Sequence, residues 1–432
     1  MFNDLAGANG GLTGRAKIKV IGVGGAGNNA VNRMLEAGLK SADFYVVNTD
    51  SQILALSPCE NKIQIGAALT KGLGAGADPD VGRAAAEESK DVLTEAVKGT
   101  DLLFITAGMG GGTGTGAAPV IAKIARDMKI LTVAVVTEPF GFEGKHRMEN
   151  TVKGLDNLKK YVDTLIVIPN DKIKTVVPKG TSMPEALRVA DEILKQGIKG
   201  ITELIVNPSL INLDFADVKT ILKDKGIAHL GVGVATGENR IIEAVRVAVN
   251  SPLLETTIEG ARGIILNIVG GQDLTFDEVY DAAELVRSVV DASANIIFGA
   301  RIDPNVQDEV EITVIATGFP GYDNRREDEQ RRAYTSGALY DDVNYGNGVR
   351  RMSVSQSPYY RPVQPMQPVQ QQPIQQQPVQ PIQPVQPVQP VQQQPVMPTR
   401  SNVENETGIE RPTGKTVPKF IERLKNFGKK ND

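Results

Sequence analysis

The 432-residue chain contains no tryptophan, one cysteine and two histidines. Cys59 has no second cysteine to pair with, which excludes an internal disulfide and leads us to expect a reducing, cytoplasmic environment. His146 and His229 have no second plausible ligand near them in the sequence. We therefore expect neither a structural zinc site nor a histidine-based metal centre.

Long hydrophobic runs and a strong net charge are also missing. No segment approaches the ~18 consecutive apolar residues that a membrane helix needs, so we expect no direct membrane span. Residues Met1 to Leu12 have no apolar core, which predicts that they are not a signal peptide. The formal net charge is only −4, which gives no support for binding nucleic acid.

Apolar residues make up 41% of the chain, enough to fill the cores of two or three domains. Between about Lys17 and Pro169, short apolar segments alternate with helical patterns. This alternation predicts an α/β domain in which helices cover both faces of a parallel sheet. The predicted strands are Ile18–Val23, Phe44–Val47, Leu102–Thr106, Leu131–Val136 and Leu165–Ile168.

A glycine-rich loop, Gly-Gly-Gly-Thr-Gly-Thr-Gly at 110–116, lies between one of these strands and an Ala-rich segment, Ala117 to Met128. A strand that leads through glycines into a helix presents unpaired backbone N–H groups where the helix dipole favours an anion. The threonines add hydroxyl donors. No Gly-Lys-Ser/Thr follows, so the loop is not a Walker A motif. We interpret it as a phosphate-binding loop, since a flexible turn does not explain this composition.

Two further glycine segments occur in the same region. Residues 22–27, Gly-Val-Gly-Gly-Ala-Gly, match the dinucleotide pattern G-x-G-x-x-G, and Asp50 lies about where a ribose-binding acid is expected. This motif leaves open a nicotinamide-dependent oxidoreductase, although the sequence offers no convincing acid or base for hydride transfer. Residues 72–77 form the third segment. Three glycine loops at the ends of adjacent parallel strands suit a nucleoside triphosphate better than a single pyrophosphate.

A long helix is predicted next in the chain. Ser182 and Glu185 match a capping box, and Pro184 lies in the first turn. An apolar stripe then recurs at steps of three and four. Its members are Leu187, Ala190, Leu194, Ile198, Ile201 and Ile205. A helix ending near Asn207-Pro208 spans about 36 Å at 1.5 Å per residue, long enough to bridge two domains.

A second, smaller α/β unit is predicted between about Ile211 and Phe319. The expected strands are Leu230–Ala235, Gly263–Val269, Asn295–Ala300 and Glu311–Thr317, and the expected helices are Ile241–Val249 and Phe276–Val290.

The composition changes after Phe319. Gln and Pro dominate residues 356–398, so this stretch cannot form a core and is predicted to be an extended spacer. Residues Arg411 to Asp432 carry seven basic and two acidic side chains. Phe420, Ile421, Leu424 and Phe427 recur there at helical spacing. The pattern leaves two interpretations open, a peptide that docks on a partner or a solvated tail.

The segment Asn-Leu-Asp-Phe-Ala-Asp at 212–217 carries two carboxylates, Asp214 and Asp217. Acids three residues apart can orient a water molecule or a metal ion. The alternative is a turn before a helix at Val218–Leu222, with Asp217 near the N-cap. On the pattern alone, capping is the commoner role.

Taken together, the motifs at 110–116 and 212–217 resemble those of the tubulin/FtsZ family. The resemblance covers residues 12–319 and includes Thr-Glu-Pro-Phe at 137–140 and Asn-Ile-Val-Gly-Gly at 267–271. It implies an α/β fold with a parallel-sheet, Rossmann-like GTPase domain, a long central helix, a smaller α/β C-terminal domain and a disordered tail. The implied segments are a disordered N-terminus (1–11), the GTP-binding domain (12–180), the central helix (181–207), the C-terminal domain (208–319), a disordered linker (320–411) and a partner-binding peptide (412–432).

The same resemblance implies an assembly-dependent GTPase that polymerises head to tail into protofilaments and forms the division ring at midcell. The implied ligands are GTP, GDP and Mg²⁺, and membrane adaptors would bind through 412–432. Asn212, Asp214 and Asp217 match the loop that reaches into the next subunit's pocket and positions the attacking water. In the layout that the resemblance implies, Asp214 and Asp217 lie at the far end of the long helix from the glycine loops, so one subunit cannot readily join them and a head-to-tail neighbour can. If Asp214 and Asp217 are only helix caps, the alternative hypothesis is a nucleotide-binding scaffold that polymerises without hydrolysing the nucleotide.

The residues that match the family's nucleotide contacts lie in separate segments. The positions implied to line the phosphates are Gly24, Gly25, Ala26, Gly27, Asn28, Ala75, Gly76, Gly111, Gly112, Thr113 and Gly114. Glu143 and Arg147 match the ribose and α-phosphate contacts, and Asn29, Asn170 and Asp191 match the guanine contacts. Three features depart from the family, and one is the terminal peptide, which reads Thr-Val-Pro-Lys-Phe-Ile at 416–421 where the family usually has an acidic residue near its start. Leu187 stands where many members have an aromatic that stacks on guanine, and Ala26 replaces a common glycine.

Overall fold

The computed structural model describes residues 16–320, except 208, 212 and 252–256. The expectations for the N-terminus (1–11), for the peptide (412–432) and for all but the first residue of the linker (320–411) lie outside the described residues.

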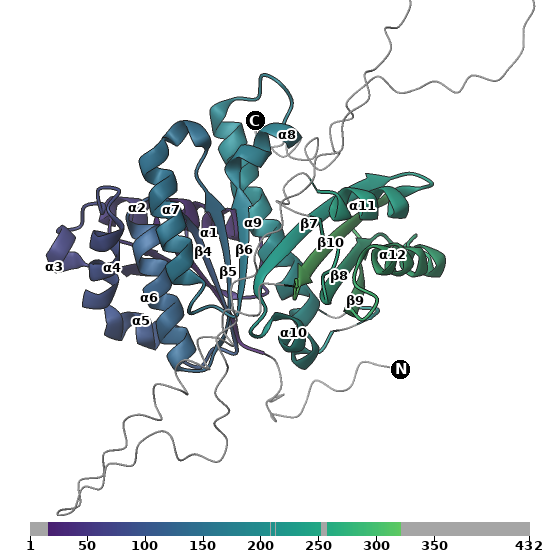
Figure 1. The fold of residues 1–432 in the computed structure, drawn as a ribbon, viewed down its shortest axis with the longest axis horizontal. Helices are drawn as coiled ribbons and strands as arrows, with labels where there is room; N and C mark the ends of the chain where they lie inside the picture. The colour runs from purple at the N-terminus through teal and green to yellow at the C-terminus, as the bar shows by residue number, and fades with distance from the viewer. Residues whose placement is uncertain (1–15, 208, 212, 252–256, 321–432) are drawn as a thin grey trace, which may run out of the picture. The chain divides into compact units, whose positions relative to one another are not determined.

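The described chain is built on one ten-stranded sheet in the order β3-β2-β1-β4-β5-β6-β7-β10-β8-β9 (Figure 1). The strands are β1 (Ile18–Val23), β2 (Asp43–Asn48), β3 (Asn61–Gln64), β4 (Leu102–Gly108), β5 (Leu131–Glu138), β6 (Thr164–Pro169), β7 (Gly226–Thr236), β8 (Gly263–Gly270), β9 (Asn295–Ile302) and β10 (Glu309–Thr317). All nine strands predicted from the sequence are present, and β3 is an additional one.

The described helices surround this sheet. They are α1 (Gly24–Glu36), α2 (Ser51–Leu56), α3 (Ala67–Thr70), α4 (Pro79–Glu88), α5 (Lys90–Val97), α6 (Thr113–Asp127), α7 (Lys145–Leu158), α8 (Ile173–Val176), α9 (Met183–Val206), α10 (Phe215–Leu222), α11 (Arg240–Val249) and α12 (Phe276–Val289). None of them combines the length and the hydropathy that a bilayer crossing requires.

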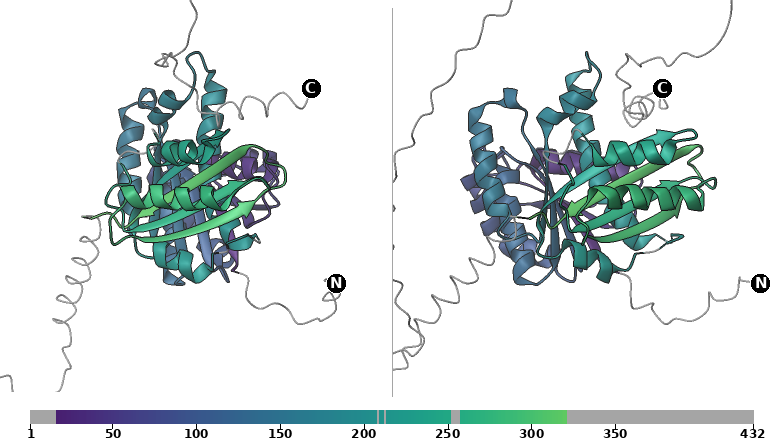
Figure 2. Two further views of the ribbon diagram at one scale, coloured as in Figure 1. Left: turned by 90° about the vertical axis from the view of Figure 1, so that its right-hand side faces the viewer. Right: turned by 45° about the vertical axis from the view of Figure 1, so that its right-hand side comes forward.

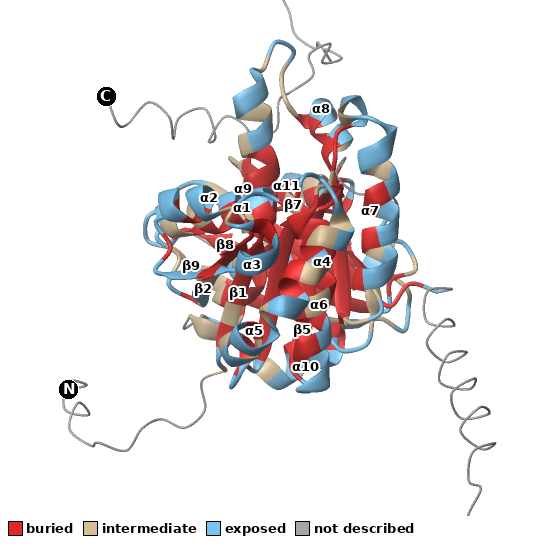
Figure 3. Ribbon diagram, turned by 90° about the vertical axis from the view of Figure 1, so that its left-hand side faces the viewer, coloured by how far each residue is buried: buried red, intermediate tan, exposed pale blue. Residues whose placement is uncertain are grey.

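Strands β1 to β6 pair in parallel throughout, as predicted. Their side chains alternate between two apolar cores: Val20 packs into the core on the α1 and α9 side, and Ile21 into the core on the α4, α6 and α7 side. Figure 3 shows α4, α6 and α7 over this second core; α6 is buried along most of its length, whereas α4 and α7 also have exposed residues. Because both faces are covered, strands β1, β4, β5 and β6 read as nearly continuous apolar runs in the sequence.

The smaller α/β unit is present but is not a separate sheet. Strand β7 pairs in parallel with β6 over Gly226–Ala228, and it then pairs antiparallel with β10. Strand β8 is antiparallel to β10 and parallel to β9. Helices α11 and α12 contribute to a third apolar core over these strands, which are the green part of the sheet in Figure 2. The two predicted domains therefore share one continuous hydrogen-bonded sheet.

Helix α9 packs between these two parts of the sheet. It contacts β5 in the first part and β8 and β10 in the second. Two glycines allow the close approach: an added Cβ would lie 2.6 Å from Leu230 at Gly197 and 2.8 Å from Thr313 at Gly200. The predicted bounds are confirmed, since α9 has Ser182 as its N-cap and Asn207 as its C-cap. The predicted capping box is wrong, because the Ser182 side chain makes no capping hydrogen bond.

Candidate nucleotide-binding site

The parallel arrangement brings the predicted glycine loops together. Strands β1, β2, β4, β5 and β6 run in one direction, so their carboxyl ends share one edge of the sheet. The segments leaving this edge include 24–27, 110–113, 139–147 and 170–172. This edge, called here the glycine edge, is where an open α/β sheet binds its ligands.

The first glycine loop turns directly into helix α1. Gly24 has φ +70°, and a Cβ at this position would lie 2.8 Å from the backbone nitrogen of Gly114. The loops at 24–27 and 110–116 are therefore in direct contact. A Cβ on Gly25 would meet no atom within 4 Å, so its backbone borders open space. Gly27 serves packing instead, because a Cβ there would lie 2.3 Å from the Thr106 carbonyl oxygen of β4.

Asn28 is fully buried behind this loop. In the orientation that satisfies its amide, the side-chain nitrogen donates to the carbonyls of Gly22, Gly24 and Val47 at 3.0, 2.7 and 3.2 Å. The side chain thereby joins the ends of β1 and β2 to the loop. Asn28 thus holds the loop in place from behind, while the exposed Ala26 and Asn29 lie on its outer side.

The second and third glycine segments also meet. A Cβ on Gly112 would lie 2.8 Å from the Cβ of Ala75, whereas Gly111 and Gly76 border open space. Helix α6 begins at Thr113, so its unpaired first-turn N–H groups point toward this opening. Each of the three segments therefore contains a glycine whose backbone borders open space, Gly25, Gly76 and Gly111, and such exposed backbone donors suit a phosphate chain.

The threonine hydroxyls of the second loop are already engaged. The Thr113 hydroxyl lies 2.9 Å from that of Thr49, and the Thr115 hydroxyl accepts the Gly110 N–H at 2.8 Å. These bonds fix the loop between β2 and α6. Thr49 was not predicted as a site residue because an isolated threonine after a strand carries no pattern. Asn150 is a second such residue, since its amide donates to the Ala77 carbonyl at 3.3 Å and ties α7 to the third loop.

Glu143 and Arg147 form an ion pair across one turn at the start of α7. The Glu143 carboxylate also accepts the Phe140 N–H at 2.9 Å, which orders the turn after β5. Nearby, Asp171 accepts the Gly141 N–H at 3.0 Å. The structure therefore places both predicted ribose and phosphate contacts on one ordered turn of the glycine edge.

Asp191 lies where α9 packs against α1. Its carboxylate is 2.8 Å from the Nε of Arg33, and the side chains of Asp191 and Arg33 are 11% and 32% exposed. Burial raises the pKa of the Asp191 carboxyl above its ordinary value, and the hydrogen bond and charge of Arg33 oppose this rise. Asn29 lies one helical turn before Arg33 on α1, on the same face.

Asn170 follows β6 and is 8% exposed. Its side-chain oxygen is buried and has no hydrogen-bond partner among the described residues. An unpaired buried acceptor is costly unless a ligand supplies a donor, which a purine base can do. Leu187, on the first turns of α9, is 44% exposed and leaves its apolar surface uncovered.

The acids of 212–217 are not at this edge. The Asp214 carboxylate accepts the Ala216 N–H at 3.4 Å and is the N-cap of α10, so the placement of the cap at Asp217 is wrong. Both Asp214 and Asp217 are exposed, and Asn212 lies outside the described residues. Helix α10 lies at the opposite edge, because the Thr164 hydroxyl at the amino end of β6 donates to the Leu222 carbonyl.

The span of α9 separates the two groups. It has 24 residues, so its ends lie about 36 Å apart. Figure 1 shows α8 and α10 at opposite ends of the molecule. One subunit therefore cannot bring Asp214 to its own glycine loops.

Asp50, the candidate ribose ligand of a dinucleotide, has a local role. Its carboxylate accepts the N–H groups of Gln52 and Ile53 at 2.9 and 3.2 Å and caps α2. Asp50 and the G-x-G-x-x-G motif at 22–27 were the two features that favoured a nicotinamide site. Because Asp50 caps α2, only the glycine motif is left.

A parallel sheet with three contacting glycine loops and a helix N-terminus at its carboxyl edge defines an α/β protein that binds a phosphorylated nucleotide. Residues 17–178 match the Tubulin/FtsZ family, GTPase domain, and residues 226–320 match the FtsZ family, C-terminal domain. The chain belongs to the tubulin/FtsZ family. It is a GTPase and binds guanine nucleotides.

Solved structures agree with this assignment. The chain is 46% identical to the FtsZ of M. jannaschii in an empty dimer, with a TM-score of 0.68, covering 70% of this chain and 88% of that one. A mutant form of the same M. jannaschii protein gives the same identity and TM-score, with coverage of 71% and 92%. CetZ1 from Haloferax volcanii, a GDP-bound monomer, shares the fold at 24% identity and a TM-score of 0.61, covering 74% of this chain and 99% of that one.

Proposed function

We propose that this chain polymerises head to tail and hydrolyses GTP at the interface between subunits, with Asp214 and Asp217 of one subunit acting on the nucleotide of the next. One observation carries the proposal: the glycine edge and the exposed acids lie at opposite ends of α9. A head-to-tail neighbour is the arrangement that brings them together. The FtsZ of M. jannaschii, which this chain resembles over most of its described residues, is described as a dimer.

In the proposed complex, the loops at 24–27, 72–77 and 110–114 hold the phosphates, and Glu143 and Arg147 hold the ribose and α-phosphate. Asn29, Asn170 and Asp191 read the guanine through amide and carboxylate groups. Asp191 is suited to this because Arg33 opposes its protonation. The incoming Asp214 and Asp217 would orient the attacking water, and the backbone donors would stabilise the charge that develops on the transferred phosphoryl group.

The chain's own residues are consistent with a magnesium ion held mainly by the nucleotide. Among the described residues, no three His, Cys, Asp or Glu side chains gather into a metal cluster. Mg²⁺ commonly binds phosphate oxygens and water, with few protein ligands. When bound, it would neutralise phosphate charge, and the glycine loops would supply the remaining donors.

On the cellular scale, the proposal is a cytoskeletal polymer in the cytoplasm that forms the ring at the division site. Residues 412–432 would attach it to membrane-adaptor and regulatory proteins. The match of residues 17–178 and 226–320 to the Tubulin/FtsZ family GTPase domain and the FtsZ family C-terminal domain supports the proposal. Homopolymer formation is its central element, and no nucleic acid partner is proposed.

Two measurements test the trans arrangement. The first follows phosphate release and light scattering as functions of protein concentration with Mg²⁺ present. Turnover should be negligible below a threshold and should rise together with scattering above it. A specific activity that is independent of concentration would mean that each monomer has a complete site, and the proposal would be wrong.

The second measurement mixes two inactive variants. Asp214→Asn removes the acid, and Gly25→Asp places a negative charge in open space beside the phosphates without a packing clash. The mixture should regain part of the turnover, because some interfaces then combine an intact acid with an intact glycine edge. Gly25→Ala is the matched control for the glycine edge. If the mixture stays as inactive as its components while both variants still assemble, hydrolysis in trans is excluded.

A further inference from the structure

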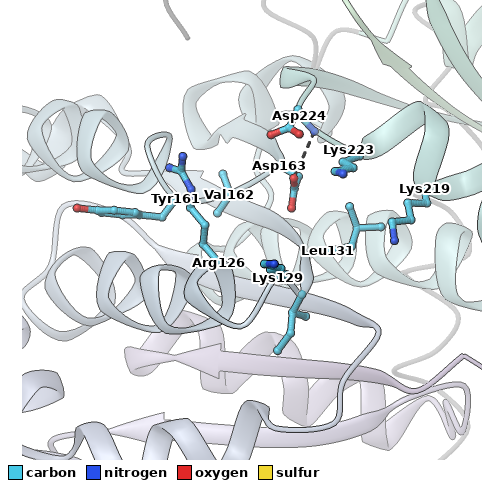
Figure 4. A pocket seen from close by; sticks show the side chains of 10 residues that line it. Arg126, Lys129, Leu131, Tyr161, Val162, Asp163, Lys219, Lys223 and Asp224 are labelled. Atoms are coloured by element: carbon cyan, nitrogen blue, oxygen red, sulfur yellow. Dashed lines mark hydrogen bonds between the residues drawn. The ribbon is translucent and has the colours of Figure 1, made fainter. Parts of the chain in front are cut away.

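A cavity of about 360 Å³ lies at the edge opposite the glycine loops, beside α10 (Figure 4). Its floor includes Leu131 at the start of β5 and Val162 just before β6, both buried. Its volume is near the lower end of the range for small-molecule sites, about 300–1,000 Å³. Neither the glycine edge nor the proposed catalytic acids use this cavity.

Four cationic side chains surround the cavity. Arg126 lies in the last turn of α6 and Lys129 just after that helix, whereas Lys219 lies on α10 and Lys223 is its C-cap. The Arg126 guanidinium donates to the Lys160 carbonyl. Within the described ranges, the ammonium groups of the three lysines form no ion pair or hydrogen bond. All four side chains are exposed, so their long stems can adjust to a ligand.

The two acids at the cavity do not balance this charge. The Asp163 carboxylate accepts the backbone N–H of Thr132 at 2.9 Å and that of Asp224 at 3.3 Å, so it serves to hold the turn before β6. Asp224 is the second acid at the cavity. Four cations against two carboxylates leave an excess of positive charge over an apolar floor. Such a site favours a compact, multiply charged anion.

We propose that this cavity binds a soluble diphosphate or polyphosphate group. Lysine ammonium groups act as mobile point charges that bind phosphate oxygens, and several of them can share one ligand. The ligand would join the end of α6 to α10, the helix whose N-cap is Asp214. Since α6 begins at Thr113 in the phosphate loop and has 15 residues, the cavity lies about 22 Å from the glycine edge.

The test uses the full chain with its guanine site saturated by excess GDP and without Mg²⁺, and pyrophosphate is the titrant in a calorimeter. GDP retention is measured in parallel, so that displacement from the glycine edge is recognised. We expect one pyrophosphate per chain, with an affinity that falls as salt is raised. Pyrophosphate that binds only by displacing GDP, or not at all, would overturn the proposal.

Variants locate the binding. The double variant Lys219→Ala/Lys223→Ala should weaken pyrophosphate binding by at least about tenfold, since each charged contact contributes measurably. Lys129→Glu, on a different segment, should weaken it as well. Lys123→Ala is the matched control, because Lys123 is an exposed lysine of α6 that does not line the cavity. Unchanged affinity in the double variant would place the anion elsewhere. The experiment requires no assembly, so its outcome is independent of the proposed head-to-tail polymer.

Discussion

The Nε of Arg33 on α1 lies 2.8 Å from the carboxylate of Asp191 on α9. This pair joins the helix that follows the first glycine loop to the helix that spans the molecule. Burial raises the pKa of the Asp191 carboxyl, and Arg33 opposes this rise and so favours the charged form of the buried acid.

Replacing Arg33 with alanine should destabilise the protein at neutral pH by roughly 1–3 kcal/mol, because it leaves a buried carboxylate without its partner. Chemical unfolding of both proteins measures the difference. Arg83→Ala is the control: Arg83 pairs with Asp80 on the surface, and exposed pairs contribute only about 0–1 kcal/mol. Equal losses in the two variants would contradict the assigned role of Arg33.

The same variant should show a defined pH dependence. The folded-state pKa of Asp191 is above its ordinary value, so folding favours the protonated carboxyl, and the stability this provides at low pH is lost as pH rises through the folded pKa. Removing Arg33 raises that pKa further. The stability gap between wild type and Arg33→Ala should therefore be small in acid and should widen toward neutral pH. A gap that stays constant over this interval would show that the charge of Asp191 is not involved.

Asp214 has two roles that substitutions can separate. Asp214→Asn keeps an N-cap side chain for α10, so its stability should stay close to wild type, whereas Asp214→Ala should cost about 0.5–2 kcal/mol. Both variants should retain GTP binding and lose turnover by at least about 100-fold, since a positioned acid or base contributes about 10²–10⁴. Nucleotide filter binding and phosphate release measure the two properties. If Asp214→Asn hydrolyses GTP at the wild-type rate, Asp214 serves only as the N-cap of α10 and has no role in hydrolysis.

Gly24 and Gly25 are adjacent but should respond differently to alanine. At Gly24 the backbone is left-handed and a Cβ would lie 2.8 Å from Gly114, so Gly24→Ala should destabilise the fold by more than about 1 kcal/mol and weaken GDP binding. A Cβ at Gly25 would meet no atom within 4 Å. Gly25→Ala should therefore reduce the stability and the GDP affinity less than Gly24→Ala does. Thermal unfolding and GDP affinity of the two variants test this contrast, and similar losses in both would refute it.

Leu187 offers a gain-of-affinity experiment. An aromatic side chain at this exposed position should stack on the guanine, and such contacts contribute about 0.5–1.5 kcal/mol. Leu187→Phe should therefore tighten GDP binding by about 2- to 12-fold. Val92→Phe on α5, also at an exposed apolar position, is the control and should leave the affinity unchanged. A Leu187→Phe protein with weakened or unaltered affinity would place the base elsewhere.

Deleting residues 412–432 should separate attachment from assembly. The truncated chain should polymerise and hydrolyse GTP as the full chain does, because the glycine edge and the acids both lie within 16–320. Binding to adaptor proteins should be lost. Sedimentation and phosphate release give the first result, and co-sedimentation with adaptors gives the second. Loss of polymerisation on truncation would contradict the role of this peptide as a tether.

Elements with a strong internal pattern could be predicted from the sequence. The apolar runs of β1, β4 and β5 and the stripe of α9 gave bounds close to those observed, because burial on a sheet face or a helix face imposes its period directly. Strand β3, Asn-Lys-Ile-Gln, was missed because only Ile63 is buried in it. Its pairing with β2 depends on backbone hydrogen bonds, which leave no mark on the side chains.

The residues of the candidate site also fall into two groups, those that the sequence predicts and those that it does not. The glycine loops are visible in the sequence because their composition is rare. Arg33 and Thr49 are not, because each acts through one partner that is distant in the chain, Asp191 and Thr113. The cap of α10 was misplaced by one turn since Asp214 and Asp217 are both good capping residues, and only the backbone distinguishes them. The pairing of β6 with β7, which joins the two parts of the sheet, likewise depends on tertiary structure alone.

The length of α9 also has an arithmetic consequence for the proposed filament. If each complete site needs the glycine edge of one subunit and the acids of the next, a filament of n subunits holds n nucleotides but only n − 1 complete sites. The terminal subunit whose glycine edge has no neighbour keeps its GTP, whereas the GTP at every interior site can be hydrolysed to GDP. The two ends of a filament therefore differ in their nucleotide site from the first dimer onward. The fraction of interior sites that hold GDP rises as the filament grows older.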